Sequence, residues 1–388
     1  MRYRPLFLFL PLTVLSAAED GLANLTYLND RLELHPRVAV GGRYDSNVEA
    51  AVDDPQDEIA ATGTIGTGLK YAWSEVTTVT ADVDAQLVVT NRSEQRYRNQ
   101  GQANAAILRR TDGKFISAHA GFARTDDPDQ ETGERVMVDH WTGDVGGDFT
   151  GLTNRISTRL SFERSDYLEN SRSFQADDRD QNTVMASIGY GLRLDGGDEV
   201  TLRLVGDRLI YDASTTNQDN TGVSTFLGWN RQVSEKINLS IEAGVEYRHY
   251  DASNTIPQND LISPTWQVNG RTVTADESTW SLTLSGGLQD TASGSQALQS
   301  RFNLNYGHPL NAVWSMSLGV EGFNLQDVNA VGGQPKDQRW TARGLAGTNY
   351  SFRPGLSGNV DGGYEYSSSD LLGDYDRVFV QAGITARF

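Results

Sequence analysis

The sequence predicts an all-β protein, a transmembrane antiparallel up-and-down β-barrel of about eighteen strands. Three observations support this fold class: apolar and polar residues alternate, short and long connections alternate along the chain, and the last residue is a phenylalanine. The composition agrees with a folded chain, because 38% of the 388 residues are hydrophobic and a further 39 residues are glycine. A disordered chain would have fewer apolar residues than this.

The first 18 residues have the features of a secretory signal peptide. Two arginines precede an apolar stretch from Pro5 to Leu15, and small residues follow it up to Ala18. The apolar stretch is too short for a membrane-spanning helix, which needs about 20 residues. We therefore expect export and cleavage after Ala18, followed by a short periplasmic segment over residues 19–33 and a barrel over residues 34–388.

Strict alternation of apolar and polar residues is the clearest structural signal in the chain. In INLSIEAGVEYRHY, which begins at Ile237, every second residue up to Tyr247 is apolar, and most of the residues between them are polar or charged. The pattern recurs in TVTADVDAQLVV, RISTRLSFE and WSMSLGVEG. No stretch keeps a helical period over three turns. Alternation with a period of two predicts strands with one apolar and one polar face.

Short and long connections alternate along most of the chain. Residues 74–75 and 111–113 form short connections, whereas 168–181 is a long polar stretch. Transmembrane barrels have short periplasmic turns and long outer loops, and an even strand number places both termini in the periplasm. The weakest predicted strand is 260–270, because Pro264 interrupts its alternation. If this segment is a loop, a neighbouring strand is lost with it and the count becomes sixteen.

The last strand carries the most specific signal. In DRVFVQAGITARF, alternate residues counted back from Phe388 to Val378 are apolar. A strand of this kind with a terminal phenylalanine resembles the signal by which the barrel-assembly machinery recognises outer-membrane barrels. Aromatic residues also cluster near strand ends, where a membrane interface attracts them. These residues are Tyr71, Trp73, Phe149, Trp229, Trp314, Tyr350 and Phe352.

The start of the predicted barrel resembles a known family. LELHPRVAVGGRYDSNV ends a first strand in the five residues Tyr44 to Val48, and a variable acidic loop then leads to the glycine-rich strand GTIGTGLKY. This arrangement is similar to the opening of the type 2 β-barrel porins, outer-membrane barrels that are often encoded in exopolysaccharide gene clusters. The resemblance implies an outer-membrane barrel connected with polysaccharide secretion, and it brings no catalytic residue with it.

Many charged residues of the strands fall on the face opposite the apolar one. An arginine or lysine facing lipid at mid-membrane would cost about 2–4 kcal/mol, so we expect these charges to face the interior. Two interpretations stay open: a polar conduit whose arginines bind carboxylates or phosphates, or cross-strand ion pairs that fill and stabilise the interior. The predicted lumen-lining residues are Arg155, Arg159, Arg203, Arg248, Arg301, Arg343, Asp82, Asp84, Glu242 and Glu246.

No group of residues predicts catalysis. The chain has no cysteine and five dispersed histidines, and it lacks the common hydrolase, metalloprotease and nucleotide-binding motifs. His140 and Asp144 share the inward face of one strand, a spacing that is ordinary for β-structure. The acidic segments 53–58 and 126–134 lack the spacing of a calcium loop. We therefore expect solvated acidic loops, and neither a metal site nor a cofactor.

The predicted function is a porin-like channel in the bacterial outer membrane for polar solutes or polysaccharide export. The alternative is a non-conducting structural or interaction barrel in an outer-membrane or exopolysaccharide-secretion assembly. Expected partners are outer-membrane lipids, lipopolysaccharide, the barrel-assembly machinery, and polysaccharide or small polar solutes. A net charge of −18 argues against nucleic acid. The acidic loops attract cations, but solvent screens their charges over about 8 Å at physiological ionic strength. We therefore expect the channel to prefer cations only weakly, and more strongly at low salt.

Overall fold

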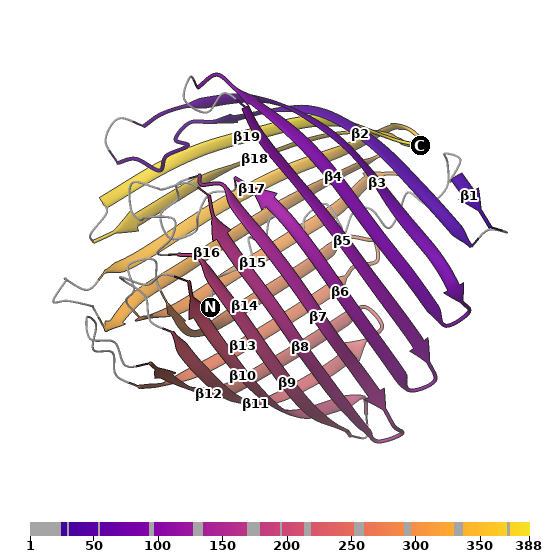
Figure 1. Cartoon of the computed structure of the whole chain (residues 1–388), viewed down its shortest axis with the longest axis vertical. Helices are drawn as coiled ribbons and strands as arrows, with labels where there is room; N and C mark the ends of the chain where they lie inside the picture. The colour runs from indigo at the N-terminus through magenta and orange to yellow at the C-terminus, as the bar shows by residue number, and fades with distance from the viewer. Residues whose placement is uncertain are drawn as a thin grey trace.

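The chain forms a closed antiparallel β-barrel in the computed structural model (Figure 1). Consecutive strands pair with one another from β2 to β19, and β19 pairs with β2 to close the wall. Eighteen strands therefore form the barrel, which confirms the predicted fold and shows that the sixteen-strand alternative is wrong. The structure describes residues 25–28, 31–52, 55–92, 97–126, 135–168, 179–194, 196–212, 219–251, 260–290, 296–329, 337–370 and 373–388.

Every element in the described residues is a β-strand. The wall strands have 12 to 17 residues, and a tilted strand needs only about 9–11 to cross the hydrocarbon layer of a membrane. The described residues contain no candidate for a membrane-spanning helix. The wall strands are β2 Leu32–Asp45, β3 Glu58–Ser74, β4 Thr77–Thr90, β5 Tyr97–Thr111, β6 Lys114–Thr125, β7 Val138–Thr150, β8 Asn154–Tyr167, β9 Gln181–Arg193, β10 Asp198–Tyr211, β11 Asn220–Ser234, β12 Ile237–Tyr250, β13 Leu261–Val273, β14 Thr279–Asp290, β15 Gln296–Asn311, β16 Trp314–Asn329, β17 Gln338–Arg353, β18 Leu356–Ser369 and β19 Gly373–Arg387.

The two ends of the barrel differ in their connections. The turn from β3 to β4, and every second connection after it, lies at one end, which we call the short-turn end. Gly113 and Gly355 occupy two of these turns with φ of 67° and 76°, a conformation that side chains other than glycine rarely adopt. The other connections lie at the opposite, long-loop end. A short strand, β1 Leu25–Tyr27, pairs with the start of β2 at the short-turn end, where the chain also ends.

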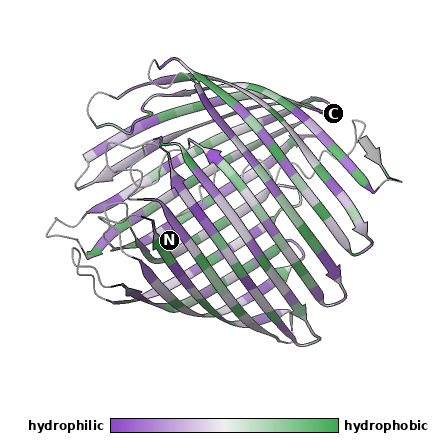
Figure 2. Ribbon diagram, in the orientation of Figure 1, coloured by the Kyte–Doolittle hydropathy of each residue, from purple (hydrophilic) through white to green (hydrophobic). Residues whose placement is uncertain are grey.

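Hydrophilic and hydrophobic residues alternate along many of the strands (Figure 2), as the sequence pattern predicts. On β2, Val38 and Val40 are exposed on the outer surface, whereas Arg37 and Arg43 point to the other side. The buried residues of the described chain are mostly polar or charged. The barrel therefore has an apolar outside and a polar inside, the reverse of an ordinary soluble domain.

The segment around Pro264 is a strand, as predicted. β13 pairs with β12 from Leu261 to Thr272, and Pro264 lies opposite Val245. Its pairing with β14 is shorter and begins only at Trp266. A proline has no N–H to donate to a ladder, and is tolerated in a strand where one side is unpaired.

Candidate channel interior

Charged side chains from strands that are not neighbours meet inside the barrel. Arg43 Nη2 on β2 lies 2.8 Å from Oδ2 of Asp126, which follows β6. Arg37 Nε on β2 donates to Asp84 Oδ1 on β4 at 2.7 Å. One or more strands separate these partners along the wall, so the side chains can meet only on the inner face.

Glycines on β3 make room for one of these contacts. The guanidinium of Arg37 crosses β3 to reach both Asp82 and Asp84, and Arg37 Nη1 donates to Asp82 Oδ2 at 2.9 Å. A Cβ at Gly66 would overlap the Asp84 carboxylate and lie 2.7 Å from the Val83 carbonyl oxygen. The glycine-rich pattern of this strand therefore has a packing reason, because a larger side chain would displace the ion pair.

A buried ionic cluster lies at the long-loop end. Arg43 Nη2 contacts Glu58 Oε1 at 2.9 Å, and Arg98 Nη1 contacts Asp126 Oδ2 at 2.6 Å. Arg135 contributes a third cation, 3.1 Å from Asp45. The side chains of Glu58 and Asp126 are only 0% and 3% exposed.

The prediction that acidic residues 53–58 and 126–134 are solvated is therefore wrong for Glu58 and Asp126. Opposite charges on β2 and β5 draw these carboxylates inward, where each gains an ion pair that compensates its burial. Sequence reasoning also missed Arg98, which is absent from the predicted lumen-lining residues. The available signal was the alternation of Arg98 with Gln100 and Gln102, which all lie on the inward face of β5.

Ion pairing determines the charge state of Asp126. Burial by itself would raise the pKa of this carboxyl group, but the hydrogen bond and charge of Arg43 and the charges of Arg135 and Arg98 hold the pKa well below its usual range. Asp126 therefore stays ionised in neutral and mildly acidic solution.

Further ion pairs continue this cluster around the barrel closure. Glu365 on β18 accepts hydrogen bonds from Arg343 Nε at 2.6 Å and from Arg377 Nη2 at 3.0 Å. Arg377 Nε also lies 3.9 Å from Asp45 Oδ1, which joins the two groups. We call the whole set the ionic belt, and it consists of Arg43, Asp45, Glu58, Arg98, Asp126, Arg135, Arg343, Glu365 and Arg377.

Two of the predicted lumen-lining arginines form pairs on the opposite part of the wall. Arg248 is 1% exposed and donates from Nε to Glu246 Oε1 at 3.0 Å. Arg203 Nη2 lies 2.6 Å from Glu242 Oε2, and its guanidinium stacks over the ring of Phe226 at 4.2 Å. A cation held by both a carboxylate and an aromatic face is fixed in position.

Other predicted residues remain more accessible. The side chains of Arg155 and Arg159 are 41% and 55% exposed while paired with Asp148 and Asp144. Arg301 lies on the inward face of β15, opposite Ser285. The structure thus places all ten predicted residues on the inner face, and their role in lining a conduit stays a prediction.

His140 and Asp144 contact different residues of the neighbouring strand β8. His140 Nδ1 lies 3.1 Å from Ser165 Oγ, whereas Asp144 forms an ion pair with Arg159. We assign no catalytic role to these contacts.

The inward face of β13 to β15 differs from the ionic belt, because amide and hydroxyl groups line it. Gln267 Nε2 and Thr283 Oγ1 each donate to Asn269 Oδ1 at 3.2 Å. Asn303 Nδ2 donates to Glu321 Oε1 at 2.9 Å. We call this region the amide face; besides Arg271 and Arg301 it consists mainly of Ser263, Thr265, Gln267, Asn269, Ser281, Thr283, Ser285, Gln289, Gln299, Asn303 and Asn305.

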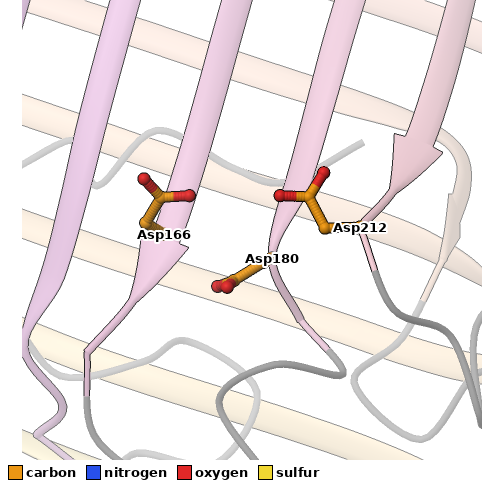
Figure 3. A group of neighbouring side chains, drawn as sticks. All are labelled: Asp166, Asp180 and Asp212. Atoms are coloured by element: carbon orange, nitrogen blue, oxygen red, sulfur yellow. The ribbon is translucent and has the colours of Figure 1, made fainter.

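Three carboxylates converge at the long-loop end (Figure 3). Asp166, Asp180 and Asp212 each offer an oxygen within 4.8 Å of the others. Arg164 Nη2 already lies 2.8 Å from Asp166 and 2.7 Å from Asp212, and the Tyr167 N–H donates to Asp180 at 2.6 Å. These contacts account for the cluster, and we assign no metal to it.

Aromatic residues gather on the outer surface near the short-turn end. The rings of Trp314 and Tyr350 are 6.2 Å apart, and those of Tyr350 and Phe352 are 5.0 Å apart. The terminal Phe388 is exposed, and its N–H donates to the Pro36 carbonyl at 2.9 Å. This placement fits an interfacial girdle. The role of Phe388 in assembly stays a prediction.

Comparison with known proteins shows similarity in fold alone. No family model matches the sequence, and no curated protein sequence does either. The chain is similar to the outer membrane protein OpdK from Pseudomonas aeruginosa, whose structure with vanillate has a TM-score of 0.52, 12% identity, and coverage of 93% of this chain and 100% of that one. OccK9 (OpdG) of the same organism has a TM-score of 0.52 and 8% identity over 94% and 100% of the two chains. A BenF-like porin from Pseudomonas fluorescens Pf-5 has a TM-score of 0.50 and 9% identity over 92% and 99%.

Proposed function

We propose that the protein is a porin-like channel of the bacterial outer membrane that passes small polar solutes. The observation that carries the proposal is a closed wall of eighteen strands with an apolar outside and an inward face rich in ion pairs. Known barrels of 16 to 18 strands enclose an aqueous channel. The fold similarity to a BenF-like porin and to OpdK supports the same function.

The accessible arginines provide groups that a solute can contact. Arg155, Arg159 and Arg203 keep between 33% and 55% of their side-chain surface exposed while holding a carboxylate partner. A guanidinium can exchange one carboxylate or phosphate partner for another with little change of geometry. Polar and charged solutes can therefore pass this part of the wall while each guanidinium keeps a hydrogen-bonding partner.

The proposal includes an orientation in the membrane. The signal peptide is removed after Ala18, the predicted periplasmic segment runs only up to the start of β2 at Leu32, and both chain ends lie in the periplasm with the short-turn end. The long-loop end then faces outward, where outer-membrane lipids and lipopolysaccharide surround it. Phe388 serves the barrel-assembly machinery. Polysaccharide export rests on the sequence resemblance alone, because the structural neighbours lend it no support.

The ionic belt favours the second candidate, a non-conducting structural or interaction barrel. The belt brings Asp126 and Arg135 from a loop connection into buried positions against β2 and β5. If such contacts close the lumen, the barrel serves as a partner in an assembly and passes no solute. An enzyme is disfavoured, because the fold is similar to that of porins, which are channels.

Single-channel recording in planar bilayers tests the proposal. We expect discrete conductance steps from the purified full-length protein, and none from the same detergent without protein. Protein that inserts into vesicles, resists proteolysis within its strands and never conducts would instead support the closed barrel.

A further inference from the structure

Within the described wall, one pair of neighbouring strands loses its pairing although both strands continue. β13 and β14 pair from Val273–Thr279 up to Trp266–Gly286 and no further. Both strands nevertheless continue, because β13 stays paired with β12 to Leu261 and β14 stays paired with β15 to Asp290. We call the unpaired stretches, residues 261–265 and 287–290, the seam. It lies at the long-loop end.

The seam is unlike the other strand boundaries of the described wall. At every other boundary, at least one strand ends within three residues of the last pair. At the seam, both strands continue for four or more residues without pairing. Parting β13 from β14 there breaks no backbone ladder, whereas parting any other two neighbours does.

The sequence supports the same conclusion independently. Pro264 lies within the unpaired stretch of β13 and cannot donate a hydrogen bond across it. Interior strands of a closed barrel are paired on both sides, and proline belongs at an edge. On β14, Gly287 lies opposite Thr265 when the register is continued, and it has no side chain of its own to pack across the boundary. Both strands therefore have residues that disfavour continued pairing.

Side chains lie at the point where the ladder between β13 and β14 ends, and they keep the seam closed. Thr265 Oγ1 donates to the Gly286 carbonyl at 3.2 Å, in place of a backbone donor. Trp266 covers Gly286, where an added Cβ would lie 2.5 Å from the indole nitrogen. Ser263 and Leu288 are only 4% exposed, so the seam is not an open hole.

The chemistry on the two sides of the seam suits a neutral molecule. On the outer surface, Ile262 is 75% exposed, and an apolar side chain at this place favours contact with lipid. On the inner surface, Ser263, Thr265 and Gln289 are polar and uncharged, and they belong to the amide face. Apart from Asp290 at the end of β14, these two stretches carry no charged residue, so few counter-ions face a charged solute there, whereas a neutral one loses little by passing them.

We propose that the seam opens as a lateral route, through which small, neutral, mainly apolar molecules move from the lumen into the outer leaflet of the membrane. The route rests on the proposed channel, because the molecule first enters the lumen. Polar solutes follow the axis of the barrel and do not use the seam.

A disulfide lock tests the proposal, because the chain has no cysteine of its own. Continuing the register places position 264 opposite 288, so Pro264→Cys combined with Leu288→Cys joins the two strands on oxidation. The matched control is Val268→Cys with Leu284→Cys, a pair that lies opposite in the intact ladder. The probe is N-phenyl-1-naphthylamine, whose fluorescence rises when it enters the membrane of Gram-negative cells that make each variant.

We expect cells with the oxidised control to take up the probe as fast as cells with the unmodified protein. The oxidised seam lock should lower uptake to the level of cells that lack the protein, and dithiothreitol should restore it. Single-channel conductance should be equal in the locked and control proteins. Normal conductance with unchanged probe uptake in the locked protein would overturn the lateral route. Probe uptake that depends on the seam, in a protein that shows no conductance, would contradict the proposed axial channel for polar solutes. It would still support the lateral route.

A second variant covers the case in which the cysteine pair does not fold. Pro264→Val restores an N–H and adds a residue that favours strands, so the ladder can extend past Trp266. We expect slower probe uptake and unchanged conductance. Uptake equal to or faster than that of the unmodified protein would argue against the seam as the path.

Discussion

The ionic belt and the amide face show how one barrel wall can have two kinds of interior. Both regions have the same strand geometry and the same apolar outer surface. In the ionic belt, buried charges such as Arg43 and Glu58 join strands to one another and to loop residues. On the amide face, Asn269 accepts local hydrogen bonds from Gln267 on the same strand and from Thr283 on the adjacent one.

The difference affects where the wall can move. A buried carboxylate without its arginine would be costly, so the ionic belt holds its strands and loop segments together. Neutral amides can exchange hydrogen bonds with water at little cost, and they impose no such constraint. The only described boundary with a split ladder lies beside the amide face, between β13 and β14.

The largest expected effect comes from breaking the ionic belt at its centre. Arg43→Met removes the cation shared by Glu58 and Asp126 and leaves two carboxylates with less compensation in a buried site. We expect the free energy of unfolding to fall by about 3–5 kcal/mol, measured by urea titration in lipid vesicles. A loss in the free energy of unfolding of less than about 1 kcal/mol, the value of an exposed ion pair, would show that the belt does not stabilise the fold.

A change in ion selectivity is expected from Glu242→Gln. This substitution leaves Arg203 charged, accessible and without the carboxylate that lies 2.6 Å away. The unmodified channel should prefer cations weakly, and the variant should shift its reversal potential under a KCl gradient toward anions. Asp112→Asn, in an exposed turn, removes the same charge and serves as the control. An equal shift in both variants would mean that net charge, and not the wall, sets selectivity.

A small effect is expected from Arg159→Met. Its partner Asp144 is on the same inner face, but the arginine is more than half exposed to solvent. We expect the free energy of unfolding to change by about 0–1 kcal/mol. Urea titration of Arg159→Met and Arg43→Met side by side compares an accessible ion pair with a buried one. Similar losses in the free energy of unfolding would contradict the difference that we expect between the two pairs.

The smallest expected effect is that of mild acid on the ionic belt. Because the pKa of Asp126 is held below its usual range, its contribution to stability is fully present above the ordinary carboxyl value of about 4 and is lost only at lower pH. The loss in the free energy of unfolding caused by Asp126→Asn, measured by urea titration, should therefore be the same at pH 7 and pH 5. A clearly smaller loss at pH 5 than at pH 7 would contradict the pairing.

The sequence by itself determined the class of fold and the side of the wall on which each strand residue lies. A period of two leaves a side chain only two directions, so the alternation around Ile241 or Val83 was sufficient to assign both faces. It also indicated the weak point at Pro264, because a missing N–H is a property of the residue itself.

Only the tertiary structure decided which charges meet. Asp126 and Arg43 are 83 residues apart in the chain, and their contact depends on the closure of the barrel and on the path of a loop, neither of which the local pattern encodes. The same holds for the seam, because the pairing of β13 with β14 reflects the register of several neighbouring strands at once. The local period of the sequence determines the face of the wall to which each side chain points, whereas contacts across the lumen depend on the closed arrangement of all eighteen strands.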